Sequence, residues 1–199
     1  MIKIEVEGEA GASASASQIT PRPPVYWAQI KRDLERLMAT PPGTNVRGFL
    51  TDDEGELLSA LACEAGRLGP VLEIGSWCGR STIWLAQGAK LAGTVVLALD
   101  HHRGSEEHQP GEMFFDADLV DGEGRVDTLR EFRRNIAQAG VEDTVIPIVA
   151  GTQQANAILP HTLGMVFIDG GHSLEAALTD WRSVGHRVLP GGILAIHDV

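Results

Sequence analysis

The most constraining feature of this 199-residue sequence is a regular alternation of short apolar runs with segments of helical periodicity. The apolar runs are Val71–Ile74, Val95–Leu99, Val145–Val149, Met165–Ile168 and Ile193–Ile196. Short runs that are predominantly apolar are typical of parallel strands buried on both faces. Because helical patterns separate them, we predict an α/β fold, a Rossmann-like parallel sheet with right-handed crossovers and helices on both faces.

The helical patterns begin ahead of the first apolar run. The capping box Thr51-Asp-Asp-Glu54 predicts a helix from about residue 52 to 67. Further helices are expected at Ser81–Leu91, Thr128–Ala139 and Leu174–Val188.

The N-terminal region has a different character. Residues 9–23 are small, polar and flanked by proline, so we expect residues 1–24 to be a flexible lead and residues 25–199 to form a single domain. Within that domain Tyr26–Met38 has helical spacing, and this helix either packs on the core or covers a substrate pocket.

Charge and cysteine content exclude several classes of protein. The formal charge of -11 disfavours nucleic-acid binding and polyanionic substrates. Two cysteines, Cys63 and Cys78, do not make a disulfide framework. The N-terminus has no secretion signal, and no apolar stretch is long enough to span a membrane, so we expect a soluble cytoplasmic protein.

The connection at residues 101–125 is unusually long. It holds seven acidic residues and two arginines, and loops of this length are usually functional or disordered. His101, His102 and His108 lie in it, and their spacing alone does not distinguish a metal site from ordinary loop residues.

Glycines and carboxylates follow the apolar runs, at the edge of the sheet where open α/β folds bind their ligands. The turn Glu73-Ile-Gly75-Ser-Trp-Cys-Gly79-Arg-Ser81 leads from a strand to a helix, and Asp100 stands where a carboxylate can bind both ribose hydroxyls. A nicotinamide dinucleotide or S-adenosylmethionine would suit this pattern, although each glycine could also serve only a tight turn. Glu73 would repel a pyrophosphate and suit the ammonium of an amino acid, which favours S-adenosylmethionine.

The chain here resembles the class I S-adenosylmethionine-dependent methyltransferases, whose first two motifs are similar to Glu73–Ser81 and Asp100. Residues 167–173, Asp180-Trp181, 189–192 and 196–198 are similar to the metal-dependent O-methyltransferase and cephalosporin-hydroxylase-like branch, which includes enzymes acting on sugars of macrolide and aminocoumarin antibiotics. The resemblance covers residues 50–199. It implies that Glu73, Gly75, Gly79, Ser81, Asp100 and Gly151 bind the cofactor.

A divalent metal fits the last two strands of this pattern. Asp169 and Asp198 each follow an apolar run, and neighbouring carboxylates repel each other unless a cation lies between them. Mg²⁺ is expected by its availability, while His197 as a third ligand would admit softer metals. His197 could instead be a packing residue or a partner of the ligands. The resemblance makes His172 the general base, with helix capping as its alternative role.

The sequence departs from the family in its strand count. Class I methyltransferases normally have seven strands, whereas five are found here, in the expected order 3-2-1-4-5 with the fifth as an unpaired edge. We therefore expect a fragment, an edge covered by a second copy or a partner, or a natural reduced form.

The expected function is metal-assisted methyl transfer from S-adenosylmethionine to a hydroxyl of a small molecule. One alternative is a non-catalytic cofactor-binding or interaction domain that a partner completes. A third reading is an NAD-dependent dehydrogenase. No nucleophile elbow or phosphate-binding loop of hydrolases and NTPases occurs in the sequence.

Overall fold

In the computed structural model, which describes residues 2–6, 32, 45–171 and 174–197, the strands form one sheet in the order β1-β6-β5-β2-β3-β4. The strands are β1 (Ile2–Val6), β2 (Val71–Ile74), β3 (Val96–Asp100), β4 (Val145–Val149), β5 (Leu163–Ile168) and β6 (Val188–His197). Strands β2 to β6 are parallel and, counted from β2, have the order 3-2-1-4-5. The predicted α/β architecture is confirmed.

The prediction of an unpaired edge beyond the last parallel strand is wrong. Strand β1 pairs antiparallel with β6, from Ile2 opposite His197 to Val6 opposite Ile193. Its sequence alternates apolar residues with Lys3 and Glu5, a period-two pattern that is typical of a strand. The expectation of a flexible lead did not take this pattern into account. The rest of that lead, and the helix expected at Tyr26–Met38 apart from Arg32, lie outside the described residues.

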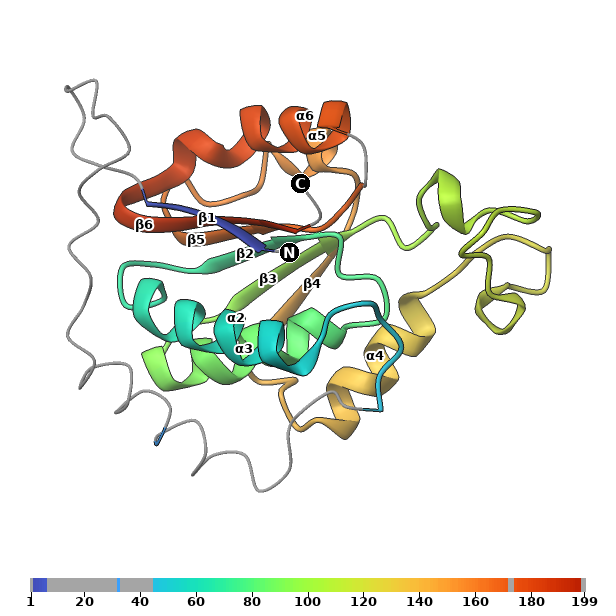
Figure 1. The fold of residues 1–199 in the computed structure, drawn as a ribbon, viewed down its shortest axis with the longest axis horizontal. Coiled ribbons are helices and arrows are strands. Elements are labelled where there is room, and N and C mark those ends of the chain that lie inside the picture. Colours follow the sequence, from blue (N-terminus) through green and yellow to red (C-terminus); the bar gives the residue numbers. More distant parts are fainter. Residues whose placement is uncertain (1, 7–31, 33–44, 172–173, 198–199) are drawn as a thin grey trace.

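Helices cover both faces of the sheet, and Figure 1 shows α2 and α3 on one face with α5 and α6 on the other. The helices are α2 (Asp52–Ala65), α3 (Arg80–Ala92), α4 (Leu129–Gln138), α5 (Thr152–Ala155) and α6 (Leu174–Val184). Thr51 and Glu54 form the predicted capping box of α2. The last expected helix is shorter than predicted, because a 3-10 turn at Gly185–Arg187 follows Val184. No helix within the described ranges is long and apolar enough to cross a membrane.

The core has two layers, one on each face of the sheet. Met165 and Phe167 of β5 pack with Trp84 of α3 on one face, whereas Val166 and Ile168 pack on the other. Because successive residues of a strand point to opposite faces, both layers need apolar side chains, which explains why the runs are apolar at consecutive positions. Strand β4 lies at the outer edge and leaves Ile146 and Val149 exposed.

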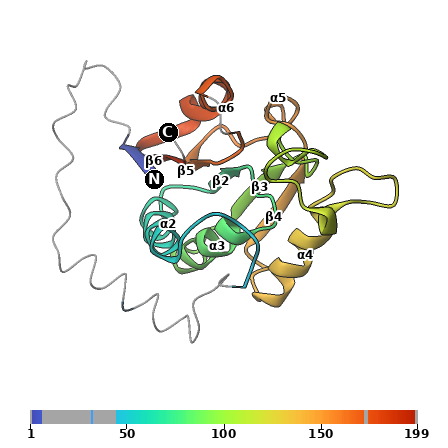
Figure 2. The same cartoon turned by 45° about the vertical axis from the view of Figure 1, so that its right-hand side comes forward.

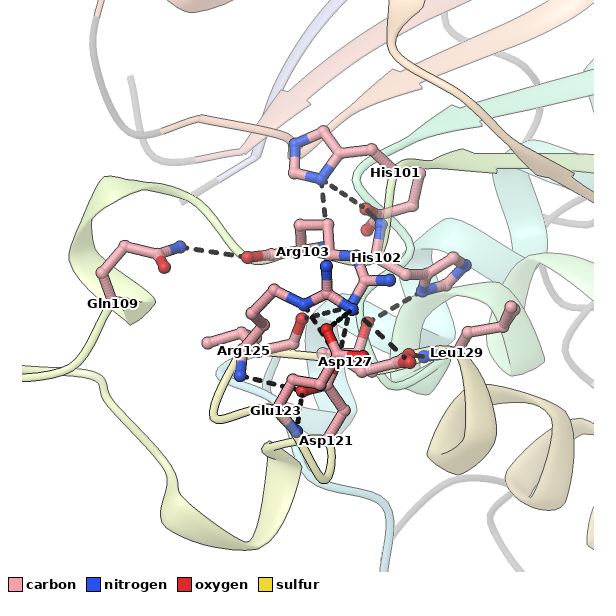
Figure 3. A network of polar contacts seen from close by, with 12 residues as sticks. His101, His102, Arg103, Gln109, Asp121, Glu123, Arg125, Asp127 and Leu129 are labelled. Atoms are coloured by element: carbon pink, nitrogen blue, oxygen red, sulfur yellow. Dashed lines mark hydrogen bonds and ion pairs between the residues drawn. The ribbon is translucent and has the colours of Figure 1, made fainter.

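Residues 101–127 form an arm that projects beyond the end of β3 (Figures 1 and 2). Two 3-10 turns, Glu106–His108 and Ala117–Leu119, and a set of ion pairs organise it. Arg103 lies within 3.2 Å of Asp121 and 3.7 Å of Asp127, while Arg125 pairs with Asp121 (Figure 3). Backbone N–H groups of Arg125 and Glu123, together with the Arg125 side chain, lower the pKa of Asp121 to about 2. The two arginines of the arm, Arg103 and Arg125, thus form ion pairs with part of the acidic side chains that the sequence concentrates in this segment.

Candidate functional site

A cleft of about 210 Å³ opens at the carboxyl ends of the parallel strands. Gly75 follows β2, Asp100 ends β3, Gly151 follows β4, and Asp169 follows β5, and all four line the cleft. The structure therefore brings together four of the residues that the sequence singled out. His172 and Asp198, the expected base and one expected metal ligand, lie outside the described residues.

Gly75 allows two loops to meet backbone to backbone. It has φ +89°, and a Cβ atom there would lie 2.4 Å from Gly170 Cα and 2.5 Å from the Asp169 carbonyl oxygen. The Asp169 N–H donates to the carbonyl of Ile74 at 2.8 Å, which holds the two loops together. Only glycine combines this φ with this approach, so the turn after β2 is built against the loop that carries Asp169.

Gly79 has a different role, at the start of α3. It occupies the N-cap position with φ +89°, close to Phe132 of α4, and does not line the cleft. Its contribution is to turn the chain into α3, whose first N–H groups face the same edge of the sheet as the cleft. The expectation that Gly79 contacts the cofactor stays a prediction.

Asp100 is fixed by backbone donors. Its Oδ2 accepts the N–H of Trp77 at 2.7 Å, and its Oδ1 accepts the N–H of His102 at 2.6 Å. Trp77 itself adopts φ +41°, a conformation uncommon for a non-glycine residue. A carboxylate oxygen has two lone pairs, so both oxygens can still accept a bond from a ligand in the cleft.

Glu73 lies beneath the cleft instead of in it. Its side chain is fully buried and accepts hydrogen bonds from Ser81 Oγ at 2.6 Å and from Thr82 Oγ1. Burial raises the pKa of Glu73 to about 8, an effect that the two hydroxyl groups oppose and that the charges of Asp169 and Asp100 reinforce. Glu73 and Ser81 therefore join β2 to the first turn of α3, and a bond from either to the cofactor stays a prediction.

A second hollow adjoins the cleft and shares Gly75, Trp77, His108 and Asp169 with it. Its remaining lining includes Phe49, Arg80, Ser81 and His197. Trp77 and Arg80, which lie inside the glycine turn, thus take part in its walls. Phe49 was not foreseen, because it stands in an irregular segment with no motif around it.

His197 lies between two carboxylates. Its Nδ1 is 3.0 Å from Asp169 Oδ1, and its Nε2 is 3.6 Å from Glu54 Oε1, with the side chain only 6% exposed. The pKa of Glu54 is lowered, because hydrogen bonds from Thr51 and the nearby imidazole outweigh the opposing effect of burial. Whether His197 is a metal ligand, a partner of the ligands or a packing residue stays a prediction. Within the described ranges no three His, Cys, Asp or Glu side chains are arranged to hold a metal ion.

Asp180 joins the cleft from α6, opposite the glycine turn. Burial raises its pKa, which a hydrogen bond from Thr152 partly offsets. Asp180-Trp181 is one of the motifs on which the family resemblance depends, and the structure places Asp180 in the lining of the cleft. His101 and His108 of the arm also line the cleft, whereas His102 is buried against Thr128, with its Nδ1 2.8 Å from Thr128 Oγ1.

Residues 72–199 match a family described as a methyltransferase domain. The chain belongs to the class I S-adenosylmethionine-dependent methyltransferase domains. This confirms the resemblance at the level of the family, and the arrangement of the five parallel strands is that of the methyltransferase core.

Solved methyltransferases have the same fold. The structure is similar to the O-methyltransferase NovP, with a TM-score of 0.60, 16% identity and coverage of 86% of this chain and 83% of NovP. TomG from Streptomyces achromogenes, an O-methyltransferase of tomaymycin synthesis solved with S-adenosylmethionine, has a TM-score of 0.54, 17% identity and coverage of 89% and 67%. A putative O-methyltransferase from Klebsiella pneumoniae has a TM-score of 0.53, 19% identity and coverage of 88% and 66%, so this methyltransferase domain spans slightly less than two thirds of that protein.

Proposed function

We propose that this methyltransferase domain transfers a methyl group from S-adenosylmethionine to a hydroxyl of a small molecule, assisted by a divalent metal ion. The observation that carries the proposal is the convergence of Gly75, Asp100, Gly151 and Asp169 on one cleft. A ligand in that cleft would meet two glycine turns and two carboxylates at the ends of four strands.

The chemistry of the cleft suits the cofactor. The Asp100 carboxylate, held by two backbone N–H groups, can accept hydrogen bonds from ribose hydroxyls. Asp169 and Asp100 place negative charge in the lining, which favours a cationic sulfonium and disfavours the pyrophosphate of a dinucleotide. When bound, S-adenosylmethionine supplies an electrophilic methyl group. The residues of this chain would then act mainly by orienting the two reactants, which is the principal source of rate in such a transfer.

The acceptor hydroxyl must lose its proton. We assign this step to His172, because it follows Asp169 by three residues and histidine titrates near neutral pH. His197 would keep the Asp169 carboxylate in place through its bond to Oδ1. A divalent ion, Mg²⁺ by availability, would be held by Asp169 with Asp198 and would supply Lewis acidity that lowers the pKa of the acceptor hydroxyl.

Two measurements test the proposal on the full chain. Isothermal titration should show binding of S-adenosylhomocysteine, and a mass-spectrometric assay should show addition of one methyl group to at least one member of a panel of phenols, catechols and sugars. Binding of NADH in place of S-adenosylhomocysteine would favour a dehydrogenase. Cofactor binding with no transfer to any acceptor, with and without Mg²⁺, would favour a non-catalytic domain.

A further inference from the structure

The two backbone N–H groups that hold the Asp100 carboxylate come from strained positions. Within the residues that the structure describes, the non-glycine residues of positive φ are Trp77, at +41°, and His102, at +57°. Trp77 donates its N–H to Asp100 Oδ2 at 2.7 Å, and His102 donates its N–H to Asp100 Oδ1 at 2.6 Å. Such a backbone is unfavourable for a residue with a side chain and persists only where other contacts impose it. Because both donors of one carboxylate have this strain, the fold specifies the orientation of Asp100.

Contacts with the start of α4 impose the conformation of His102. Its ring Nδ1 lies 2.8 Å from Thr128 Oγ1 (Figure 3), and its carbonyl oxygen accepts the Thr128 N–H at 3.2 Å. The imidazole also packs near Phe132 of α4, with ring centroids 5.2 Å apart. His102 is only 2% exposed, and Thr128 is fully buried. Burial lowers the pKa of His102, although the charges of Asp100 and Asp127 oppose this effect, so the ring is neutral at pH 7.

The same contact joins the two ends of the arm. The chain leaves the sheet after Asp100 and returns at Thr128, so His102 and Thr128 meet at the base of the arm. Arg103 adds to this closure through its hydrogen bond to the Val126 carbonyl at 3.2 Å. A change of the His102 backbone that withdrew its N–H from Asp100 would also break the buried contact with Thr128 and leave polar atoms unpaired.

We propose that His102 is a positioning residue for the cofactor: anchored on Thr128, it keeps Asp100 oriented toward the ribose hydroxyls of S-adenosylmethionine. Neither His102 nor Thr128 lines the cleft, so both act through Asp100. A carboxylate that already has its binding orientation loses less conformational freedom when the ligand arrives. The inference rests on the proposed function, in which Asp100 accepts the ribose hydroxyls.

Two ligands, titrated into the full chain, distinguish this positioning from a general loss of stability. They are S-adenosylhomocysteine and its dideoxyribose analogue, which lacks both ribose hydroxyls. Thr128→Val removes the hydroxyl partner of His102 and keeps the shape and the N–H of residue 128. It should weaken binding of S-adenosylhomocysteine about three- to tenfold, the range for one hydrogen bond, and leave the affinity for the analogue within about twofold of wild type. A purely structural role of the contact would weaken both ligands by the same factor.

Variants of His102 give an independent test that does not depend on the folding of Thr128→Val. His102→Ala has neither the anchor nor a side chain that tolerates positive φ, and it should reduce the affinity for S-adenosylhomocysteine in the same selective way. His102→Asn should restore most of that affinity, because asparagine adopts positive φ readily and its amide can occupy the place of Nδ1. Thr128→Ser should bind both ligands as wild type does.

Thr144→Val is the matched control, because Thr144 is a buried threonine whose hydroxyl bonds to Asp143, away from the cleft. It should bind both ligands as wild type does. If His102→Ala and Thr128→Val bind S-adenosylhomocysteine as wild type does, or weaken both ligands equally, the inference is overturned while the proposed function stands. If wild type does not distinguish the two ligands, the ribose role of Asp100 is wrong and the inference falls with it. If S-adenosylhomocysteine does not bind to wild type at all, the proposed function itself fails.

Discussion

At the scale of single residues, Glu73 shows how burial changes the chemistry of a motif. The sequence suggested a carboxylate that faces the ammonium of the cofactor, whereas the structure encloses the side chain and gives it a pKa of about 8. Such a group keeps its proton near neutral pH. Ser81 and Thr82 can bond to the protonated form as well, because hydroxyls both donate and accept.

The raised pKa of Glu73 predicts a pH dependence of stability. The folded state keeps the proton up to about pH 8, whereas the unfolded chain releases it near the ordinary value of 4.5, so the free energy of unfolding should fall as pH rises between these values. Glu73→Gln carries no such proton, so its free energy of unfolding should not fall in this way. Above pH 8 it should exceed the free energy of unfolding of wild type by on the order of a few kcal/mol. Urea denaturation at pH 5.5 and pH 8.5 measures the difference.

The exposed Glu142→Gln provides the control for this comparison, and its two curves should follow those of wild type. Equal pH dependence in wild type and Glu73→Gln would show that Glu73 is ionised in the folded protein.

Substitution of Asp100 is expected to lower the affinity for the cofactor. If its carboxylate accepts from the ribose hydroxyls, Asp100→Ala should weaken S-adenosylhomocysteine binding by about 1.5–3 kcal/mol, the range for hydrogen bonds to a charged group. Isothermal titration gives this directly. Asp143→Ala, which removes an exposed carboxylate paired with Lys90, should bind as wild type does. Unchanged affinity in Asp100→Ala would leave Asp100 only the role of holding Trp77 and His102.

At the scale of elements, the contact between the loops after β2 and β5 decides the shape of the cleft. Gly75→Ala would place a methyl group 2.4 Å from Gly170 Cα and 2.5 Å from the Asp169 carbonyl, in addition to the strain of a positive φ. Gly93→Ala has the strain alone, because its φ is +74° and no atom lies within 4 Å. We expect Gly93→Ala to cost about 1 kcal/mol and Gly75→Ala at least about 2 kcal/mol more, measured by chemical denaturation.

The pairing of β1 with β6 predicts an effect on association. Deletion of residues 1–6 would expose the backbone N–H and C=O groups of β6 between Ile193 and His197, and unpaired edges recruit other strands. Sedimentation velocity should then show more self-association than the full chain shows. Ile4→Pro, opposite Ala195, places a residue that disfavours strand pairing in β1 without shortening the chain and should act in the same direction. A monomeric truncation with an unchanged melting temperature would mean that β1 contributes little to the sheet.

At the scale of the whole molecule, the parts that sequence predicts are those that local patterns determine. Strands buried on both faces are predominantly apolar, and a capping box places Thr51 and Glu54 three residues apart. Strand ends then converge by topology, which is why Gly75, Asp100 and Asp169 could be placed at one site.

Long-range contacts have no such local pattern. Phe49 reaches the site only because Arg80 and Arg47 hold its segment from distant positions, and an arginine in a sequence does not reveal its partner. The arm is similar: its order depends on Arg103 meeting Asp121 across 18 positions. The full burial of Glu73 could not be predicted for a related reason, since it depends on the helix that packs against β2.

The expected metal site depends on the last two parallel strands, because its expected ligands follow β5 and β6 in the sequence. Asp169 lies within the described residues and Asp198 follows His197 at the end of β6, so an ion between them would join two neighbouring strands to the cleft. An ion that binds only the folded state stabilises it by RT ln(1 + [L]/Kd), roughly 2.7 kcal/mol at a hundredfold excess over Kd. We therefore expect Mg²⁺ to raise the melting temperature relative to a chelator.

The variants separate this ion from general effects of salt. Asp169→Asn should abolish the Mg²⁺-dependent shift, because it removes a charge that the ion neutralises, and Asp198→Asn should weaken it. His172→Ala should keep the shift and lose methyl transfer, whereas Asp143→Asn, an exposed carboxylate at the opposite end of the sheet beside Lys90, should keep both. Since two unneutralised carboxylates repel each other, the chelated wild type should also be less stable than chelated Asp169→Asn. Identical melting curves for wild type with Mg²⁺ and with chelator would remove the metal from the proposed function and leave deprotonation of the acceptor to His172 alone.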